Sequence, residues 1–110
     1  MRCKFDILTF GNSEKTYHQY GNKIVETFDD NMNLIKRIEY DKFERDIDVK
    51  WYDNLKNIIA HMQIEYFETE NEKGYIEIYK NNVQEYIRKS YTKIENGMKH
   101  VVDDVFQHST

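Results

Sequence analysis

The chain has 110 residues, of which 39% are hydrophobic, 15% aromatic and 33% charged, and its formal net charge is −4. This composition predicts one globular domain over residues 1–110 and argues against disorder, because aromatic side chains bury large areas. Acidic and basic residues are interleaved along the chain, which disfavours direct binding to nucleic acid or to an anionic membrane.

The first forty residues show the pattern of an antiparallel β-meander. We predict strands over residues 2–10, 15–20, 23–28 and 34–40, where apolar and polar residues largely alternate. Gly21-Asn22 suits a tight two-residue hairpin turn. Residues 29–33 form a second turn, since their Asp and Asn side chains can bond to the nearby backbone.

A longer pattern covers this second turn. The chain runs Phe28-Asp29-Asp30-Asn31-Met32-Asn33-Leu34-Ile35 and then Glu39-Tyr40-Asp41. The segment 22–41 thereby resembles one unit of the tyrosine–aspartate repeats of Rhs-type proteins, over about a fifth of the chain and in one copy. Met32 stands where the repeat usually has glycine. The resemblance implies a β-hairpin, and we carry over no function from it.

The second half is predicted to contain two amphipathic helices with a short strand, residues 75–79, between them. The apolar stripe of the first helix, which Asp53 would cap, is Trp51, Leu55, Ile58, Ile59, Met62 and Tyr66. The second helix spans residues 83–106, and its stripe is Ile87, Tyr91, Ile94, Met98, Val101 and Val105. We interpret Asn96-Gly97 as the interior of this helix, because the stripe keeps its phase across it.

Together these elements predict an α+β fold. An antiparallel β-meander of about four to five strands in the N-terminal half would pack against two amphipathic helices in the C-terminal half. The stripe of the last helix is assigned mainly to the protein's own core, because its pattern of apolar residues is nearly the reverse of what a parallel dimer prefers. The alternative is a homodimer through the last helix.

Two sets of metal-ligand residues can be picked out. His100, Asp104 and His108 are spaced by four residues, which on a helix places them on one face. A solvent-exposed helix face explains the same residues more simply. Residues 29–33 begin like an EF-hand loop, but the glycine and the bidentate glutamate of that loop are missing, so a hairpin turn is preferred.

Two catalytic arrangements can also be picked out. Asp29, Asp48 and Lys50 are compatible with a metal-dependent nuclease or hydrolase, in which two carboxylates hold Mg²⁺ and the lysine stabilises developing charge. Cys3, the single cysteine, could act as a nucleophile if His18 lay beside it. The lone cysteine and the lack of a signal-peptide core or an apolar spanning segment indicate a cytoplasmic protein.

The nine tyrosines favour a protein interface, because a domain of this size cannot bury them all. We therefore favour a non-enzymatic inhibitor that binds another protein, such as a phage anti-defence (anti-CRISPR-like) protein acting on a basic, nucleic-acid-binding host protein. The alternatives are a toxin-immunity protein or the nuclease described above. No cofactor is expected. The candidate contact residues are Asp29, Asp30, Asp46, Asp48, Glu68, Glu70, Glu72, Tyr75 and Tyr79.

Overall fold

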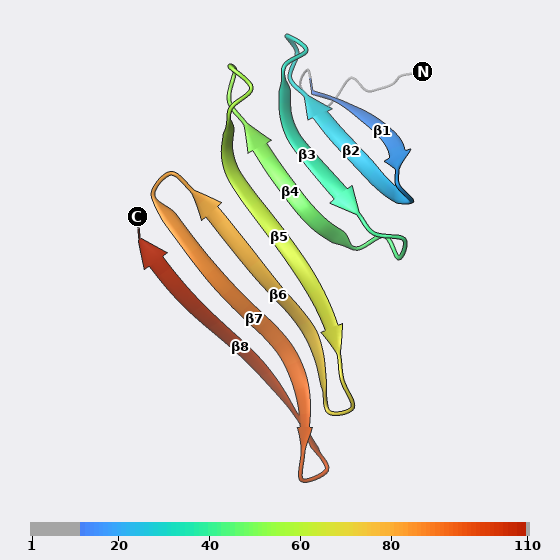
Figure 1. Ribbon diagram of the computed structural model, residues 1–110, viewed down its shortest axis with the longest axis vertical. Coiled ribbons are helices and arrows are strands. Elements are labelled where there is room, and N and C mark those ends of the chain that lie inside the picture. The colour runs from blue at the N-terminus through green and yellow to red at the C-terminus, as the bar shows by residue number, and fades with distance from the viewer. Residues whose placement is uncertain (1–11, 110) are drawn as a thin grey trace. The chain divides into compact units, whose positions relative to one another are not determined.

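The computed structural model describes residues 12–109, and these residues form eight β-strands and no helix (Figure 1). The strands are β1 (Ser13–Gln19), β2 (Asn22–Phe28), β3 (Leu34–Tyr40), β4 (Asp46–Tyr52), β5 (Ile58–Glu68), β6 (Glu72–Asn81), β7 (Gln84–Glu95) and β8 (Met98–Ser109). They follow one another in a single antiparallel sheet in chain order. The predicted α+β class is therefore wrong, and the fold is all-β.

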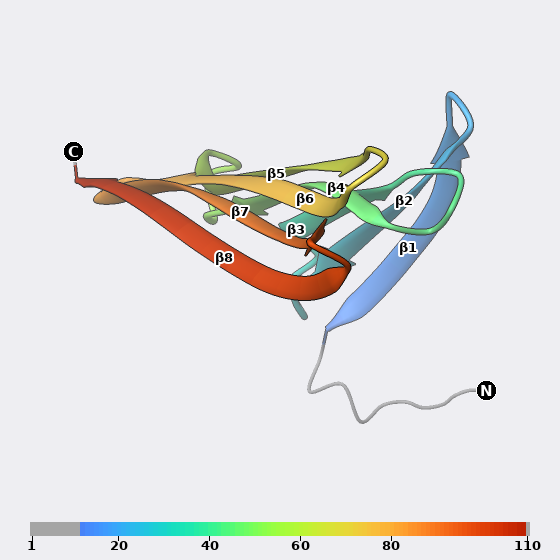
Figure 2. The same cartoon turned by 90° about the horizontal axis from the view of Figure 1, so that it is seen from below.

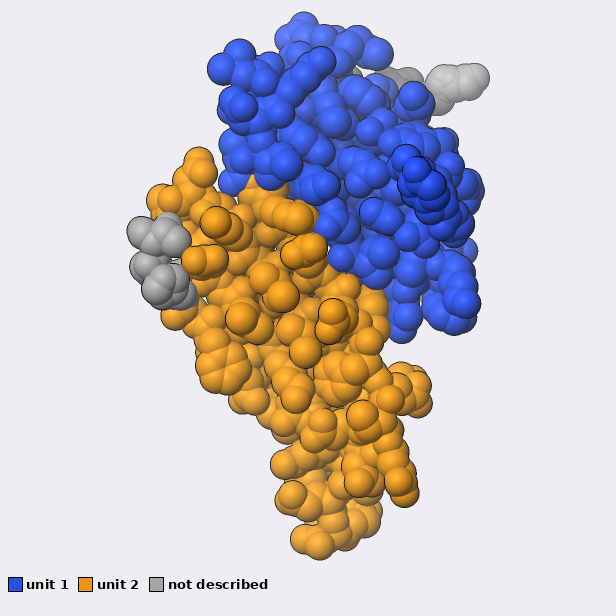
Figure 3. Space-filling model, in the orientation of Figure 1, with its two compact units in different colours: residues 1–59 blue, residues 60–110 orange. Residues whose placement is uncertain are grey.

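The chain divides into two compact units, residues 1–59 and residues 60–110, which Figure 3 colours separately. The predicted strand over residues 2–10 lies outside the described residues. In the described part, residues 12–109, no helix has the length and apolarity needed to span a membrane.

Three of the predicted strands in the first unit are confirmed. The predictions over residues 15–20, 23–28 and 34–40 correspond to β1, β2 and β3. The turn between β1 and β2 is centred one residue earlier than predicted, on Tyr20 and Gly21, whose φ angles are 52° and 83°. Two positive φ angles in a two-residue loop match the twist of the flanking strands, which is why this turn type closes hairpins.

The first unit is built on a twelve-residue period. The strands β2, β3, β4 and β5 begin at residues 22, 34, 46 and 58, and each of the three intervals holds a seven-residue strand and a five-residue loop. Each loop begins with an aspartate that follows an aromatic residue: Phe28-Asp29, Tyr40-Asp41 and Tyr52-Asp53. The hairpin turn predicted for residues 29–33 is confirmed, and it occurs three times rather than once.

The three loops share one hydrogen-bonding scheme. The Oδ1 atom of each aspartate accepts bonds of 2.8–3.1 Å from the backbone N–H groups two and four residues later. The residue three positions after the aspartate adopts a left-handed φ, at Met32 (64°), Glu44 (61°) and Lys56 (67°). That conformation crowds any residue with a Cβ, so glycine would be favoured at these positions.

The loop hydrogen bonds also lower the pKa of the carboxyl groups. Backbone donation from Asn33 holds the pKa of Asp29 below its ordinary value, and backbone donation from Asn57 does the same for the pKa of Asp53. At Asp41 desolvation raises the pKa, but hydrogen bonds from Arg45 outweigh it and the pKa is again lowered. All three carboxylates therefore form hydrogen bonds within their own loops, which these bonds close.

The packing of the first unit rests on a row of apolar side chains across three strands. Val25 of β2 lies opposite Ile38 of β3, which lies opposite Val49 of β4. Val49 is 3% exposed, and Ile24, which points to the other side of β2, is 1% exposed. Lys23 lies over the ring of Tyr40, with its Nζ 4.9 Å from the ring centroid, beside this row.

The first predicted helix is wrong. Its residues form the end of β4, the third aspartate loop and most of β5. The predicted cap, Asp53, does accept backbone N–H groups, but it does so in a hairpin loop. A helix N-cap and this loop use the same side-chain chemistry, so the residue type alone did not separate them. Leu55, assigned to the helical stripe, is 81% exposed in the loop.

The second predicted helix is also wrong. Residues 84–95 and 98–109 form β7 and β8, and Asn96 and Gly97 make the two-residue turn between them with φ angles of 54° and 75°. Asn-Gly is the preferred pair for such a turn. The residues of the helical stripe are distributed over both faces of the hairpin. The short strand predicted over residues 75–79 is confirmed as part of β6.

The second unit is a four-stranded meander in which the register is regular. Figure 2 shows β6, β7 and β8 following one another in one layer. One apolar side chain of this unit is buried among the described residues, Ile64 at 9% exposure. Several others remain largely exposed: Ile78, Val83, Ile87, Ile94, Met98, Val101, Val105 and Phe106. A single layer of strands cannot cover both of its own faces, so these side chains face solvent in the isolated chain.

Candidate functional site

The predicted contact residues of the first unit do not form one surface. The carboxylate of Asp29 accepts hydrogen bonds from Asn31 and Asn33 within its own loop. Asp30, the next residue, is exposed. Asp46 is the first residue of β4, and Asp48 follows on the same strand with 17% of its side chain exposed. Asp29 is therefore a structural residue.

The structure does not bring together the predicted nuclease residues. Asp48 lies opposite Glu39, which lies opposite Ile24, five residues before Asp29. At about 3.3 Å per strand residue, this separates Asp29 from Asp48 by about 17 Å along the sheet. Two carboxylates that share one Mg²⁺ must each approach it to about 2.1 Å. Lys50 lies with its Nζ 3.9 Å from Asp48 Oδ2.

The predicted metal ligands on the last element, His100, Asp104 and His108, are not brought together by a helix. His100 and Asp104 lie on β8, where a spacing of four residues corresponds to about 13 Å rather than one helical turn. The side chain of His108 and the whole of Cys3 lie outside the described part of the structure, so the pairing of Cys3 with His18 is not tested. Among the described residues, no group of three His, Cys, Asp or Glu side chains could hold a metal ion.

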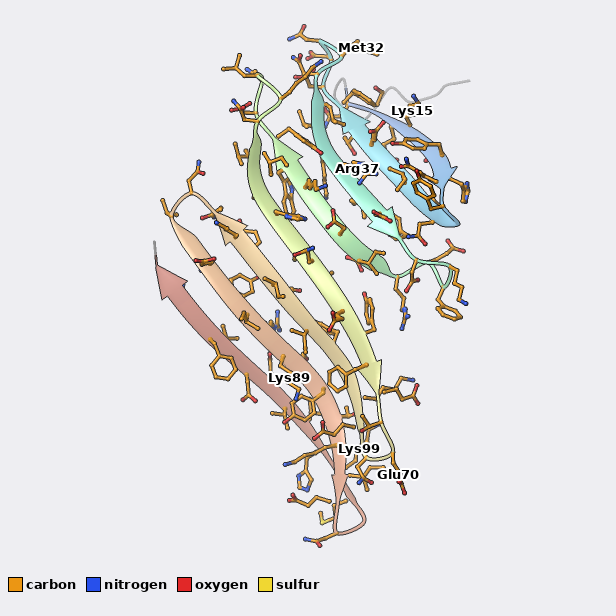
Figure 4. The ribbon with its side chains drawn as sticks, viewed as in Figure 1. Lys15, Met32, Arg37, Glu70, Lys89 and Lys99 are labelled. Atoms are coloured by element: carbon orange, nitrogen blue, oxygen red, sulfur yellow. The ribbon has the colours of Figure 1, made fainter. Side chains whose placement is uncertain are left out.

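In the second unit, the predicted residues gather around β6. Glu68 ends β5, Glu70 lies in the turn that follows and Glu72 begins β6, where Figure 4 marks Glu70 at the tip of the hairpin. Tyr75 and Tyr79 point to the same side of β6, because they are four residues apart on one strand.

The neighbouring strands add further aromatic and charged side chains to that side. Tyr66 of β5 lies opposite Tyr75, Tyr86 of β7 lies opposite Tyr79, and Arg88 lies opposite Glu77. Residues in register share a face of an antiparallel sheet. We call this surface the tyrosine face and define it by seven residues: Tyr66, Tyr75, Glu77, Tyr79, Tyr86, Arg88 and Asp103.

Two pairs of tyrosine rings flank the charged centre of the face. The rings of Tyr79 and Tyr86 are stacked at 26° with centroids 5.2 Å apart. The rings of Tyr66 and Tyr75 are tilted at 57° with centroids 6.1 Å apart. Such offset and tilted arrangements are the favoured geometries for aromatic pairs, so the two rings of each pair stabilise each other's position.

Between the pairs lies a row of hydrogen-bonded charges. The Tyr86 hydroxyl donates to Glu77 Oε2 at 2.8 Å. The Arg88 guanidinium donates from Nε and Nη2 to the two carboxylate oxygens of Asp103, at 3.0 and 2.9 Å. A two-point contact of this kind fixes the plane of the guanidinium as well as its position.

The pKa values follow from these contacts. Burial, reinforced by the hydrogen bond to Glu77, raises the pKa of Tyr86 to about 12. The hydrogen bonds to Asp103 raise the pKa of Arg88, and the same bonds from Arg88 lower the pKa of Asp103. Near neutral pH, Tyr86 is therefore neutral, Arg88 cationic and Asp103 anionic.

Sequence reasoning identified Tyr75 and Tyr79 but missed the other five residues of the face: Tyr66, Glu77, Tyr86, Arg88 and Asp103. The missing signal was the pair of turns at residues 82–83 and 96–97, because a short turn fixes the register of the strands that it joins. With both turns read, Tyr79 would have been placed opposite Tyr86.

The tyrosine face offers phenol rings, one guanidinium and two carboxylates on a sheet surface. It can therefore make apolar contacts and directional hydrogen bonds at the same time. Comparison of the chain with protein-family models, with curated protein sequences and with solved structures found no match.

Proposed function

We propose that this chain is a non-enzymatic, cytoplasmic protein-binding module that inhibits its partner by covering part of the partner's surface. The observation that carries the proposal is the tyrosine face, in which four tyrosines surround Glu77 and the Arg88–Asp103 ion pair. Tyrosine and arginine are the side chains most enriched at the energetic centres of protein interfaces. No metal or cofactor takes part in this function.

The rigidity of the face supports the same proposal. Side chains that are already held by stacking and hydrogen bonds lose little conformational entropy when a partner covers them. Tyr79 is stacked on Tyr86 and its hydroxyl accepts a hydrogen bond from Asn81 Nδ2 at 3.0 Å. The face therefore presents a preformed surface.

The charge of the chain favours a basic partner. The net charge is −4, and Glu68 and Glu70 lie near the end of the tyrosine face at the β5–β6 turn. A positively charged partner would be steered toward such a surface. We therefore keep Glu68, Glu70, Tyr75 and Tyr79 as contact residues and assign Asp29 to loop structure instead.

The test is capture of a stoichiometric partner by the tagged chain from cells that produce it, with variants matched across the sheet. Tyr79→Ala removes a ring from the tyrosine face, whereas Lys80→Ala alters the next residue of β6, which points to the other side. Loss of an interface-centre side chain costs about 2 kcal/mol or more, or about thirtyfold in dissociation constant.

We expect Tyr79→Ala to weaken partner binding and Lys80→Ala to leave it unchanged, with both variants folded by circular dichroism. Equal binding by the two variants would show that the tyrosine face is not part of the interface. A chain that captures no stoichiometric partner would refute the proposed function itself.

A further inference from the structure

The last strand of the sheet has an open edge. β8 pairs with β7 along twelve residues, and no described strand lies on its other side. Its apolar side chains are largely exposed, with Met98 at 64%, Val101 at 79% and Phe106 at 65%. Native proteins usually shorten, charge or cover such an edge, because its free N–H and C=O groups can pair with another strand.

The β7–β8 turn decides which backbone groups of β8 are free. A two-residue turn at Asn96-Gly97 makes Glu95 and Met98 a hydrogen-bonded pair, and hydrogen-bonded pairs then alternate along the ladder. The even-numbered residues of β8 bond to β7. The odd-numbered residues direct their N–H and C=O groups to the open edge: Lys99, Val101, Asp103, Val105 and Gln107.

The order of charges along β8 is self-complementary. Its first half carries Lys99 and His100, and its second half carries Asp103 and Asp104. In an antiparallel arrangement, the first half of one strand lies beside the second half of the other. A second copy of the same strand therefore presents acidic groups where this strand presents basic ones.

We propose that two copies of this chain associate through β8, antiparallel, on a twofold axis at Val102. The free N–H and C=O groups belong to odd-numbered residues in both copies, so an odd-numbered residue must face an odd-numbered residue. The two residue numbers of each facing pair therefore sum to an even number. With the axis at Val102, His100 faces Asp104 of the second copy and Met98 faces its Phe106. Both copies then place their tyrosine faces on the same side of the extended sheet.

Later axes lack this complementarity, and an axis one residue earlier, which places Lys99 opposite Asp103 of the second copy, also places Met98 opposite Asp104. An axis one residue later places Asp103 opposite Asp103 of the second copy, and an axis two residues later does the same for Asp104. Like charges directly opposite one another destabilise a sheet. The axis at Val102 also continues an apolar row, because Ile78, Ile87 and Phe106 lie in register and Met98 of the second copy would extend them.

The first experiment reassigns the charges. An acidic variant carries His100→Asp, and a basic variant carries His100→Lys with Asp104→Lys, so that each variant faces its own charge across the axis. Mass by sedimentation should rise toward twice 13.5 kDa with concentration for the natural chain. Each variant alone should dissociate about tenfold or more readily, since two cross-strand pairs become repulsive.

Mixing the two variants restores opposite charges at both pairs, so an equimolar mixture should form a heterodimer. This result requires both variants to be folded, which makes the mixture its own folding control. A natural chain that stays at 13.5 kDa at every concentration would overturn the proposal, and so would a mixture that stays monomeric while the natural chain dimerises.

The second experiment tests the register. In a Cys3→Ser background, Val102→Cys places two thiols opposite each other at a non-hydrogen-bonded pair, where Cα atoms about 4.5 Å apart fall within disulfide reach. Asp104→Cys, which would face His100, should not cross-link. Val101→Pro removes a free N–H at the edge and should abolish the dimer without unfolding the hairpin.

Efficient cross-linking through residue 102 and not through residue 104 is the expected result. Cross-linking at 104 in preference to 102 would refute the register, and a dimer unaffected by Val101→Pro would refute the β8 edge as the interface. The proposal does not rest on the proposed function, since it needs no partner other than this chain.

Discussion

Gly74, in β6, has no room for even the methyl group of alanine, so Gly74→Ala should destabilise the fold. It lies opposite Phe67 of β5 and Tyr91 of β7. A Cβ atom at this position would lie 2.5 Å from both Cα and Cβ of Tyr91 and against the carbonyl oxygen of Ser90. The Phe67 and Tyr91 rings, with centroids 6.2 Å apart, lie on the same side of the sheet as the missing side chain.

The expected magnitude of Gly74→Ala follows from two opposing effects. Replacing glycine by alanine restricts the unfolded chain and would by itself stabilise a strand by about 0.5–1 kcal/mol. Overpacking a filled site costs about 1–3 kcal/mol. The close atoms here are two backbone atoms of β7 and the Cβ atom of Tyr91, which cannot move without lengthening the hydrogen bonds of the ladder. We therefore expect a net loss of about 1–2 kcal/mol in the free energy of unfolding.

The assay is urea unfolding followed by far-ultraviolet circular dichroism, together with hydrogen exchange of the β6 and β7 amides. Ala60→Gly on β5 is the matched reverse control, and we expect it to lose about 0.5–1 kcal/mol because an ordinary strand position prefers alanine. The two changes together would show glycine preferred at one position and alanine at the other.

A Tyr91→Ala background locates the clash. Alanine keeps the Cα and Cβ atoms of residue 91, so the cost of Gly74→Ala should persist in that background. A Gly74→Ala chain as stable as the natural one would contradict a clash at residue 74. Recovery of stability in the Tyr91→Ala background would show that the tyrosine ring, and not the backbone, excludes the methyl group.

Three further outcomes are expected. Met32→Gly should raise the free energy of unfolding by about 0.5–1 kcal/mol, because it relieves a left-handed φ at an exposed side chain, and a loss in urea unfolding would contradict this. The lowered pKa values of the loop aspartates stabilise the fold above their ordinary value of 3.8, so the urea midpoint should fall as the pH drops through the folded pKa values, and less so in Asp53→Asn. Tyr86 should ionise near pH 12, read as the absorbance difference from Tyr86→Phe, and Glu77→Gln should move that ionisation toward pH 10. Because the folded state raises this pKa, the stabilisation that Tyr86 contributes is complete below about pH 10 and is lost as the pH rises through 12.

The first three described strands could be predicted because their signals are local. Residues 23–28 and 34–40 are bounded by turn residues whose side chains or φ angles select a hairpin, and both strands were found where they were expected. The same reasoning also identified the Asp29 loop. It missed the two later loops because Asp41 and Asp53 are followed by different residues, although each also comes after an aromatic residue at an interval of twelve. The hydrogen bonds show that the three loops close in the same way.

The helices failed for a different reason. Spacings of three and four residues predict a helix only where the other face is polar, and both faces of the β7–β8 hairpin carry apolar side chains. Ile87 and Phe106 lie in register on one face, while Ile94 and Val101 lie on the other. The local signals for strands were present in Val101-Val102, Val105-Phe106 and the Asn-Gly turn.

The candidate site divides along the same line. The turn chemistry, including the loop closed by Asp29, and the supply of tyrosines could be read from residue types and near neighbours alone. The stacking of Tyr79 on Tyr86 and the pairing of Arg88 with Asp103 became evident from the three-dimensional structure. These outcomes depend on strand register, and a shift of one residue in register would move every side chain of a strand to the opposite face.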